Sequence, residues 1–259
     1  MGGIFEKKPL VSVVMPAYNA ERFVEAAIRS VQSQTVADWE LLVLDDGSSD
    51  GTCAIAACLA QEDPRIRLLP NGENLGVART RNRGFDLSRG QFVALLDSDD
   101  VWHPEKLEKQ LARLAAGGDF CYCSYAIIGK NGEKARSDFL VPETVDFEKL
   151  LRQNIIGCST VLLRRELTGK YRFTTQFFHE DYVLWLQLLQ SGCRAVGCPE
   201  VLADWRYIAD SRSFDKGKSA RNRRDFYRKY LKLSLLKSAW VFAAYALTGV
   251  RKYMKGKKT

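Results

Sequence analysis

Apolar runs and amphipathic stretches alternate along the first 118 residues of the chain. Predominantly apolar runs at 10–15, 39–45, 66–70 and 91–96 predict four strands, of which the first is expected to be buried on both faces. Helical patterns follow them over about 20–33, from Ser49 or Asp50 as N-cap to about 61, within 71–88, and over about 104–116. This alternation predicts a parallel sheet with helices covering both of its faces.

The pattern changes after residue 119. Residues 119–128 predict a strand, and GKNGEK at 129–134 predicts a hairpin turn after it. A further strand is predicted at 159–165, and a strongly amphipathic helix at 180–192 that ends at Gly192. No internal repeat interrupts this order, which favours one α/β domain.

Polar clusters follow three of the four predicted strands. They are PAYNAE at 16–21, DDGSSDGT at 45–52 and DSDD at 97–100. Each cluster has a purely structural interpretation, as a helix cap, a turn or a capped helix start. Ligands of open parallel sheets bind beyond the carboxyl ends of the strands, so three such clusters together predict a binding site at that edge.

The carboxylates of the third cluster require a balancing positive charge. Asp97, Asp99 and Asp100 lie within four positions, where like charges repel and raise each other's pKa. The chain has neither the GxGxxG of a dinucleotide site nor the GxxxxGK[ST] of a phosphate loop. Carboxylates cannot bind phosphates directly, but Mg²⁺ or Mn²⁺ bridges the two. We therefore predict a divalent cation that binds a diphosphate.

Composition narrows the class of protein. The chain has 259 residues, enough for a well-buried core. Its seven cysteines are odd in number and form no CxxC pair, which predicts buried reduced thiols and disfavours a zinc site. The apolar run at the N-terminus is too short for a signal peptide, and no segment reaches the roughly 18 apolar residues of a membrane span.

Charge is distributed unevenly. Residues 1–214 carry 25 basic and 29 acidic residues, whereas residues 215–259 carry 14 basic and 2 acidic residues, a net charge of +12. Within this tail a basic helical pattern at 216–237 precedes the uncharged stretch 238–250. Basic residues with interleaved aromatic and apolar ones favour an interfacial helix on an anionic membrane. Nucleic-acid binding and packing on the chain's own domain are the alternatives.

The motifs together resemble those of family 2 glycosyltransferases. The resemblance rests on VSVVMPAYNAERFVEAAIRSVQSQT, WELLVLDDGSSDGT, ENLGVARTRNRG, FVALLDSDDVWHPEKLEKQL, NIIGCSTVLLRR and HEDYVLWLQLLQSG, and covers nearly the whole chain. It implies an inverting enzyme with a nucleotide-sugar donor and the GT-A fold, a Rossmann-like, mostly parallel central sheet flanked by helices. The last of these motifs and KLSLLKSAWVFAAYALTGVRKY resemble the bacterial branch that builds O-antigen, capsule or teichuronic acid.

The resemblance also implies roles for residues of this sequence. Those assigned to the donor nucleotide are Pro16, Ala17, Tyr18, Asn19, Glu21, Arg81, Asp97 and Ser98, with Asp45 or Asp46 accepting a hydrogen bond from the base. Those assigned to the metal are Asp97, Asp99 and Asp100. Asp181 would be the catalytic base, with Glu180 beside it and the positive helix end keeping it ionised.

One segment departs from the family's pattern. Where many relatives have a YRxH segment, this chain has WRYI, with Ile208 at the histidine position, so a metal ligand from this loop is doubtful. Arg206 or Arg212 could instead neutralise the diphosphate, with simple surface charge as the alternative. Trp205 is the better candidate for stacking against an acceptor sugar, whereas Trp185 is expected in the core.

The expected organisation is a GT-A domain at 1–214 and a basic, amphipathic helical extension at 215–259 that associates with the membrane. The resemblance implies transfer of a sugar from a nucleotide-sugar, with UDP as the expected nucleotide, to a polyprenyl-diphosphate-linked glycan at the cytoplasmic face of the plasma membrane. A nucleotidyltransferase is disfavoured because no Gly-rich basic loop follows the first strand. A non-catalytic sugar-binding protein on the same fold is the other alternative.

Overall fold

The computed structural model describes residues 8–177, 179–207 and 226–231, together with 233–235, 238, 240 and 241. The strands are β1 (Val11–Ala17), β2 (Trp39–Asp45), β3 (Ile66–Leu68), β4 (Phe92–Leu95), β5 (Val101–Trp102), β6 (Phe120–Ile128), β7 (Lys134–Phe139), β8 (Thr144–Val145), β9 (Leu162–Arg164) and β10 (Ala195–Arg206). The helices are α1 (Val24–Gln32), α2 (Thr52–Glu62), α3 (Val77–Leu87), α4 (Lys106–Ala115), α5 (Phe147–Arg152), α6 (Arg165–Lys170), α7 (Glu180–Gln190), the 3₁₀ turn η1 (Cys158–Thr160) and the π-helical turn η3 (Phe226–Tyr230).

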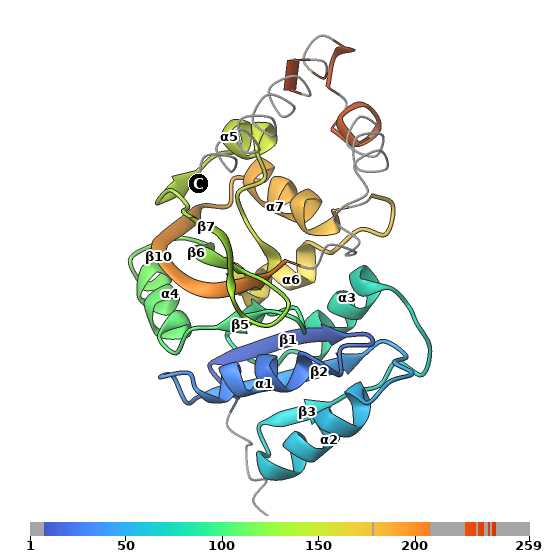
Figure 1. Cartoon of the computed structure of the whole chain (residues 1–259). Helices are drawn as coiled ribbons and strands as arrows, with labels where there is room; N and C mark the ends of the chain where they lie inside the picture. Colours follow the sequence, from blue (N-terminus) through green and yellow to red (C-terminus); the bar gives the residue numbers. More distant parts are fainter. Residues whose placement is uncertain are drawn as a thin grey trace, which may run out of the picture.

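One mixed, mostly parallel sheet organises the domain (Figure 1). Its strand order is β3-β2-β1-β4-β9-β6-β10-β5, with β7 paired to β6 and β8 paired to β10. The pairs β3–β2, β2–β1, β1–β4 and β6–β10 are parallel, whereas β9 pairs antiparallel with both β4 and β6. The carboxyl ends of β1, β2, β4, β6 and β10 therefore point to the same edge of the sheet, as predicted for the first half of the chain.

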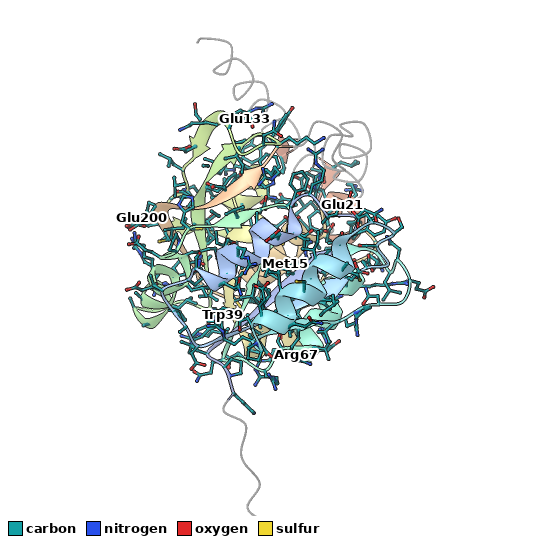
Figure 2. The ribbon with its side chains drawn as sticks, turned by 60° about the horizontal axis from the view of Figure 1, so that its bottom comes forward. Met15, Glu21, Trp39, Arg67, Glu133 and Glu200 are labelled. Carbon is teal, nitrogen blue, oxygen red and sulfur yellow. The ribbon has the colours of Figure 1, made fainter. Side chains whose placement is uncertain are left out.

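Helices cover both faces of this sheet, because the inner strands are mostly apolar on both faces. Every residue of β1 and β2 is buried. On one face Val11, Val13 and Met15 pack with α1, α2 and α4, and Figure 2 views this face with Met15 between α1 and α2. On the other face Val14 and Leu42 belong to the core formed with α3, α5, α6 and α7. The prediction of helices on both faces is confirmed.

Gly84 sets how closely α3 approaches the sheet. A Cβ atom at this position would lie 2.3 Å from Cγ1 of Val14 and 3.1 Å from a methyl of Leu44. A larger residue would push the helix away from β1 and β2. The glycine of the TRNRG segment thus allows α3 to pack where Arg81, about one turn earlier, reaches the carboxyl edge of the sheet.

The element boundaries correct several predictions. The N-cap of α2 is Gly51 and not Ser49 or Asp50, although Oδ1 of Asp50 still accepts a hydrogen bond from the Thr52 N–H at 3.0 Å. The predicted strand at 159–165 is instead the turn η1 followed by the shorter β9. The 12-residue strand β10 was not predicted, because register shifts between Cys198 and Ala203 interrupt its side-chain alternation.

The described part of the C-terminal segment packs on the domain. Phe226 and Tyr227 are buried in the same core as α5 and α7, and the Tyr227 hydroxyl donates to the Leu151 carbonyl at 3.3 Å. Trp240 is half exposed and lies under the guanidinium of Arg152. None of the helices in the described ranges has the length and hydropathy that a bilayer crossing requires. The described residues of the tail therefore pack on the chain's own domain, which was one of the alternatives.

The seven cysteines are free thiols. Burial, as predicted, holds for Cys121, Cys123, Cys158 and Cys198 but is wrong for Cys58, which is exposed on α2. The core assignment of Trp185 is confirmed, since its side chain is fully buried.

Candidate active site

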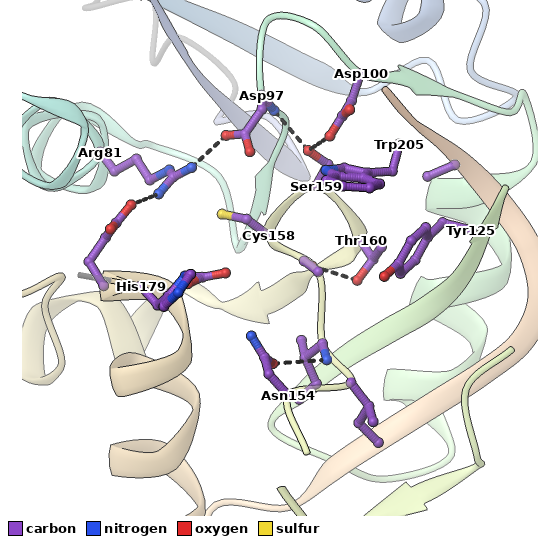
Figure 3. Close-up of a pocket in the computed structure, with 16 residues that line it drawn as sticks. Arg81, Asp97, Asp100, Tyr125, Asn154, Cys158, Ser159, Thr160, His179 and Trp205 are labelled. Atoms are coloured by element: carbon purple, nitrogen blue, oxygen red, sulfur yellow. Dashed lines mark hydrogen bonds and ion pairs between the residues drawn. The ribbon is translucent and has the colours of Figure 1, made fainter. Parts of the chain in front are cut away.

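A cavity of about 370 Å³ opens at the carboxyl edge of the sheet (Figure 3). Its walls come from six parts of the chain: α3, the loop after β4, β6, the segment around η1, the start of α7, and β10. The lining side chains are Arg81, Asp97, Asp100, Tyr125, Asn154, Ile155, Ile156, Gly157, Cys158, Ser159, Thr160, His179, Glu180, Asp181, Ala203 and Trp205.

Arg81 connects the two acidic motifs of the cavity. Its Nη2 donates to Asp97 Oδ1 at 2.6 Å, and its Nη1 donates to Glu180 Oε1 at 2.8 Å. The guanidinium is 5% exposed and lies over the ring of Phe173. Burial alone would lower the pKa of Arg81, but the charges of Asp97 and Glu180 hold that pKa above its usual value. A permanently charged group thus lies between the loop after β4 and the start of α7.

Both carboxylate oxygens of Asp100 accept hydrogen bonds from other residues of the protein. Oδ1 accepts from the Arg206 N–H at 2.8 Å, and Oδ2 accepts from the Ser159 hydroxyl at 2.5 Å. The Ser159 oxygen also accepts the N–H of Asp97 at 3.0 Å, and the Ser159 carbonyl accepts from Trp102 Nε1 at 2.7 Å. Asp100 and Ser159 therefore fix the shape of the loop that presents Asp97 and Asp99.

Asp97 and Asp99 are the carboxylates that suit a divalent cation. Burial and the charge of Asp97 raise the pKa of Asp99 to about 6, and a nearby cation would relieve this repulsion. Within the described ranges, no three His, Cys, Asp or Glu side chains form a protein-made metal site. Mg²⁺ and Mn²⁺ do not need one, since one or two carboxylates suffice when substrate phosphates and water complete the coordination.

Asp181 lies at the first turn of α7 and lines the cavity. Burial and the neighbouring charge of Glu180 raise its pKa to about 6. Desolvation thus outweighs the helix dipole that was expected to keep this carboxylate ionised, although a pKa of about 6 still leaves it ionised at neutral pH. Glu180 itself is the buried partner of Arg81. His179, the N-cap of α7, has φ of 66°, which is uncommon for a residue other than glycine.

The two adjacent carboxylates after β2 differ in their surroundings. Asp46 accepts three hydrogen bonds through Oδ1 and one through Oδ2, from donors in the loop before α3 and on α3: Asn71 Nδ2, the Thr80 hydroxyl, and the N–H groups of Leu75 and Gly76. Asp45 Oδ2 accepts from the Ser48 N–H at 3.1 Å, but its buried Oδ1 has no hydrogen-bond partner in the described part of the chain. The thiol of Cys53 lies beside it, and burial together with Asp45 raises the pKa of that thiol to about 11.

The remaining residues assigned to the nucleotide lie at the neighbouring strand ends. Pro16 and Ala17 end β1, and the Ala17 carbonyl accepts the Asp46 N–H at 2.8 Å. Asn19, with φ of 47°, accepts from the Ser49 N–H at 2.9 Å, which ties the loops after β1 and β2 together. Glu21 accepts the Gly51 N–H at the start of α2. Tyr18 is 52% exposed, and Ser98 is half-buried between Asp97 and Asp99.

Two of the three residues assigned to acceptor or diphosphate are described. Trp205 is half-buried and lines the cavity. Arg206 is buried, and its side chain donates to three carbonyl oxygens, those of Asp99, Gly129 and Lys130. These hydrogen bonds show that Arg206 stabilises the loop after β4. Arg212 and Ile208 lie outside the described residues.

Sequence reasoning gave no role to Ser159, Tyr125 or Cys158, all of which line the cavity. For Cys158 and Ser159 the signal was the segment NIIGCSTVLLRR, which carried part of the resemblance but whose residues 159–165 were interpreted as a strand, whereas Tyr125 lies in the predicted strand at 119–128. In the structure the chain bends through η1 before β9, and this bend turns Cys158 and Ser159 toward the cavity (Figure 3).

Comparisons with known proteins agree with this geometry. The family model described as glycosyl transferase family 2 matches residues 12–172. The putative teichuronic acid biosynthesis glycosyltransferase TuaG of Bacillus subtilis is 37% identical over 95% of this chain and 98% of its own length. WfgD of Escherichia coli, named as a UDP-Glc:alpha-D-GlcNAc-diphosphoundecaprenol beta-1,3-glucosyltransferase, is 38% identical over 96% of this chain and 98% of its own length.

Solved structures agree on the fold. TarS 1–349 of S. aureus in complex with UDP-GlcNAc has a TM-score of 0.70 at 18% identity, covering 93% of this chain and 72% of TarS 1–349. The mannosyltransferase PcManGT of Pyrobaculum calidifontis, in complex with GDP-Man and Mn²⁺, has a TM-score of 0.69 at 19% identity, covering 97% of this chain and 77% of PcManGT. At these identities the likeness shows the fold alone, which is GT-A. The chain belongs to glycosyltransferase family 2 and is a glycosyltransferase of the branch that builds bacterial polysaccharides.

Proposed function

We propose that this glycosyltransferase moves a sugar from a UDP-linked donor to a glycan carried on a lipid diphosphate, with inversion at the anomeric carbon. The observation that carries the proposal is that one cavity contains both Asp97, from the loop assigned to the diphosphate, and Asp181, a carboxylate with a pKa of about 6. A site with a diphosphate-binding side and a separate base has the parts that such a transfer requires.

The donor nucleotide would lie across the ends of β1, β2 and β4. Of Asp45 and Asp46, Asp45 is the better candidate for binding the uracil base. Its buried Oδ1 has no partner among the described residues and can accept a hydrogen bond from the N3–H of uracil. Asp46 is already satisfied by donors of the protein. A UDP-linked donor is also supported by the name of the relative WfgD and by the complex of TarS with UDP-GlcNAc.

The diphosphate would be neutralised at the loop after β4. The carboxylates of Asp99 and Asp97 would hold Mn²⁺ or Mg²⁺, and when bound the ion would supply positive charge to the leaving diphosphate. The Mn²⁺ of PcManGT supports the choice of cofactor. Glu180 binds one side of the Arg81 guanidinium and fixes its position. The other side of the guanidinium donates to Asp97 and keeps that carboxylate oriented.

Asp181 would act as the general base. The acceptor hydroxyl attacks the anomeric carbon from the face opposite UDP, the bond from that carbon to the UDP oxygen breaks, and UDP leaves with the electron pair. The hydroxyl proton passes to Asp181. A base whose pKa is about 6 is ionised at neutral pH and is basic enough to take this proton as the bond forms.

The acceptor and the cellular location extend the proposal. A glycan on polyprenyl diphosphate is supported by the diphosphoundecaprenol named for WfgD. Such a lipid places the enzyme peripherally at the cytoplasmic face of the plasma membrane, where the basic residues of 215–259 would bind anionic lipid. Leu235, 71% exposed, offers an apolar contact in that segment.

The test is transfer in solution. Purified protein with Mn²⁺, a UDP-sugar and a short-chain alkyl diphosphate-linked N-acetylglucosamine should yield a product whose new linkage has the anomeric configuration opposite to that of the donor, observed by NMR. A product that retains the donor's configuration would contradict the inverting mechanism. Transfer from GDP- or dTDP-sugars at equal efficiency would contradict the assignment of the donor.

A further inference from the structure

Aromatic side chains from three strands form a continuous array on one side of the cavity. Tyr125 of β6 stacks on Phe139 of β7, with ring centroids 5.0 Å apart, and meets Trp205 of β10 edge-on at 6.3 Å. Trp205 meets Tyr207 edge-on, also at 6.3 Å. These four residues, Phe139, Tyr125, Trp205 and Tyr207, are called the aromatic array below.

The strand register places the array on the cavity face. Tyr125 is opposite Phe139 in the antiparallel pair with β7 and opposite Ala203 in the parallel pair with β10. Ala203 and Trp205 are two residues apart on one strand, so both point to the same face. Tyr125, Ala203 and Trp205 all line the cavity, whereas Tyr207 lies beyond the end of β10.

The array lies on the side of the cavity that the nucleotide does not need. The groups assigned to the donor are at the ends of β1, β2 and β4, and Arg81 forms the opposite wall (Figure 3). The acceptor hydroxyl must reach Asp181, which lines the same cavity. The remaining wall, formed by β6 and β10, is therefore where the rest of the acceptor can lie.

The Tyr125 hydroxyl is a hydrogen-bond donor in this setting. Burial, and then the negative charges of Asp100 and Asp181, raise the pKa of Tyr125 well above its usual range. The phenol therefore keeps its proton at every pH at which the enzyme would work, and it can donate to a sugar oxygen.

A positively charged side chain lies at the outer end of the aromatic array. The guanidinium of Arg136, an exposed residue of β7, lies 4.4 Å from the centre of the Tyr207 ring. Stacking on an aromatic ring restrains the side chain while its N–H groups stay available to an anion.

We propose that the aromatic array is the acceptor subsite and that it takes a pyranose linked to a diphosphate. The sugar ring lies against Trp205, the Tyr125 hydroxyl donates to one of its oxygens, and the diphosphate on its anomeric carbon extends along Tyr207 to Arg136. This inference rests on the proposed function, since it uses a diphosphate-linked acceptor and Asp181 as its base.

Tryptophan fluorescence tests the sugar contact. Of the five tryptophans, Trp39, Trp102 and Trp185 are buried, while Trp205 is half-buried and Trp240 is 52% exposed. The short-chain alkyl diphosphate-linked N-acetylglucosamine should quench the emission of the wild type and of Trp240→Leu, but not that of Trp205→Leu. In Trp205→Leu the KM for this acceptor should rise at least about tenfold.

Tyr125→Phe tests the same contact without removing a ring. The loss of one hydrogen bond should raise the KM for the acceptor by about 3- to 10-fold. Calorimetric binding of UDP checks that both variants are folded. Quenching that persists in Trp205→Leu, together with an acceptor KM within about twofold of wild type in both variants, would overturn the inference.

A pair of arginines tests the diphosphate contact. Arg136 and Arg152 each lie over an aromatic ring, at 4.4 and 4.7 Å, but Arg152 is on α5 and contacts Trp240, which is not part of the array. Arg136→Gln should raise the KM for the diphosphate-linked acceptor at least about tenfold and leave that for the uncharged alkyl glycoside of the same sugar unchanged. Arg152→Gln should change neither. If both substitutions raise the KM for the diphosphate-linked acceptor equally, Arg136 is not part of the subsite. The same conclusion follows if Arg136→Gln raises the KM for the two acceptors equally.

These results separate the inference from the proposed function. If the wild type neither binds UDP nor transfers sugar, the proposed function fails, and the acceptor subsite fails with it. If UDP binding and transfer are intact but the variants leave the acceptor KM unchanged, only the subsite is wrong.

Discussion

Ser159 donates its hydroxyl hydrogen to Asp100 at 2.5 Å, and the same oxygen accepts the backbone N–H of Asp97 at 3.0 Å. One side chain of η1 thus fixes both ends of the acidic loop after β4. With its other carboxylate oxygen accepting from the Arg206 N–H, Asp100 serves to position the loop. Asp97 and Asp99 are the members that remain for a metal and a diphosphate.

Ser159→Ala should therefore reduce transfer more than it reduces stability. It leaves the buried Asp100 oxygen and the Asp97 N–H each without a partner, which costs about 1–3 kcal/mol of unfolding free energy. Loss of a group that orients metal ligands should lower activity by roughly 10- to 100-fold. Urea unfolding and initial transfer rates with Mn²⁺ measure the two effects.

Ser12→Ala is the matched control for that variant. Ser12 is also buried, donates to the carboxylate of Glu40 at 2.6 Å and accepts the Gly90 N–H at 2.8 Å, but it lies near the amino end of β1. It should lose a similar unfolding free energy and retain its transfer rate. Equal loss of activity in both variants would mean that Ser159 acts only through stability.

Asp181→Asn and Glu180→Gln should change stability in opposite directions. Because the pKa of Asp181 is about 6 in the folded protein, against the ordinary value of 3.8, the folded state loses stability as the pH rises between these values, and the full cost is present at neutral pH. Asn removes that charge, so the unfolding free energy should rise by about 1–2 kcal/mol while kcat falls by roughly 10²- to 10⁴-fold.

Glu180→Gln instead removes the buried partner of Arg81. We expect it to lower the unfolding free energy by about 1–3 kcal/mol, since the guanidinium loses a charged acceptor. Thermal unfolding at neutral pH, followed by circular dichroism, measures both variants. Destabilisation by Asp181→Asn as well would show that this carboxylate stabilises the fold, which is against its assignment as the base.

The pH profile of kcat/KM should have an acidic limb near pH 6. Protonated Asp181 cannot accept the hydroxyl proton, so activity should fall about tenfold per pH unit below that limb. The charge of Glu180 raises the pKa of Asp181, and its removal in Glu180→Gln should shift the limb to lower pH. A limb that shifts to higher pH in this variant, or stays in place, would contradict the assignment.

Asp45→Asn and Asp46→Asn should separate binding from stability. Asp45 has a buried oxygen without a partner among the described residues, so its substitution should weaken UDP binding about 10- to 100-fold with little change in stability. Asp46 accepts donors from the loop before α3, so its substitution should lower the unfolding free energy and leave UDP affinity nearly unchanged. Calorimetric titration with UDP and Mn²⁺, beside urea unfolding, distinguishes them. The reverse pattern would mean that Asp46, and not Asp45, binds the uracil base of UDP.

Sequence patterns predicted that the strand ends proposed for the donor share one edge of the sheet, because these ends follow strong local signals. Asp45 and Asp97 end fully apolar runs, and parallel strands bring such ends to one edge. The choice between Asp45 and Asp46 could not be predicted, since it depends on the turn at Gly47, where φ is 79° and the backbone of Glu73 and Asn74 approaches closely. Only the three-dimensional turn determines which carboxylate meets donors.

The pairing between distant parts of the cavity could not be predicted from local patterns, although Trp205 was named from the sequence as the candidate for stacking against an acceptor sugar. Arg81 and Glu180 are 99 positions apart, and their pairing depends on how α3 and α7 pack on the sheet. β10, which carries Trp205, contains Gly197, Pro199 and register shifts, so it lacks the alternation that identifies a strand. Asp181 was assigned through the resemblance to the family, and its pKa follows from burial that only the fold produces.

The most direct measurement is release of nucleoside diphosphate from a panel of UDP-, GDP- and dTDP-sugars by the wild type, Asp99→Asn and Asp181→Asn, with and without Mn²⁺. We expect UDP release from one UDP-sugar, stimulated by the diphosphate-linked acceptor and lost without the cation and in both variants. Absence of UDP release with the acceptor present, together with no calorimetric binding of UDP in Mn²⁺, would contradict the assignment of this cavity to UDP-sugar transfer.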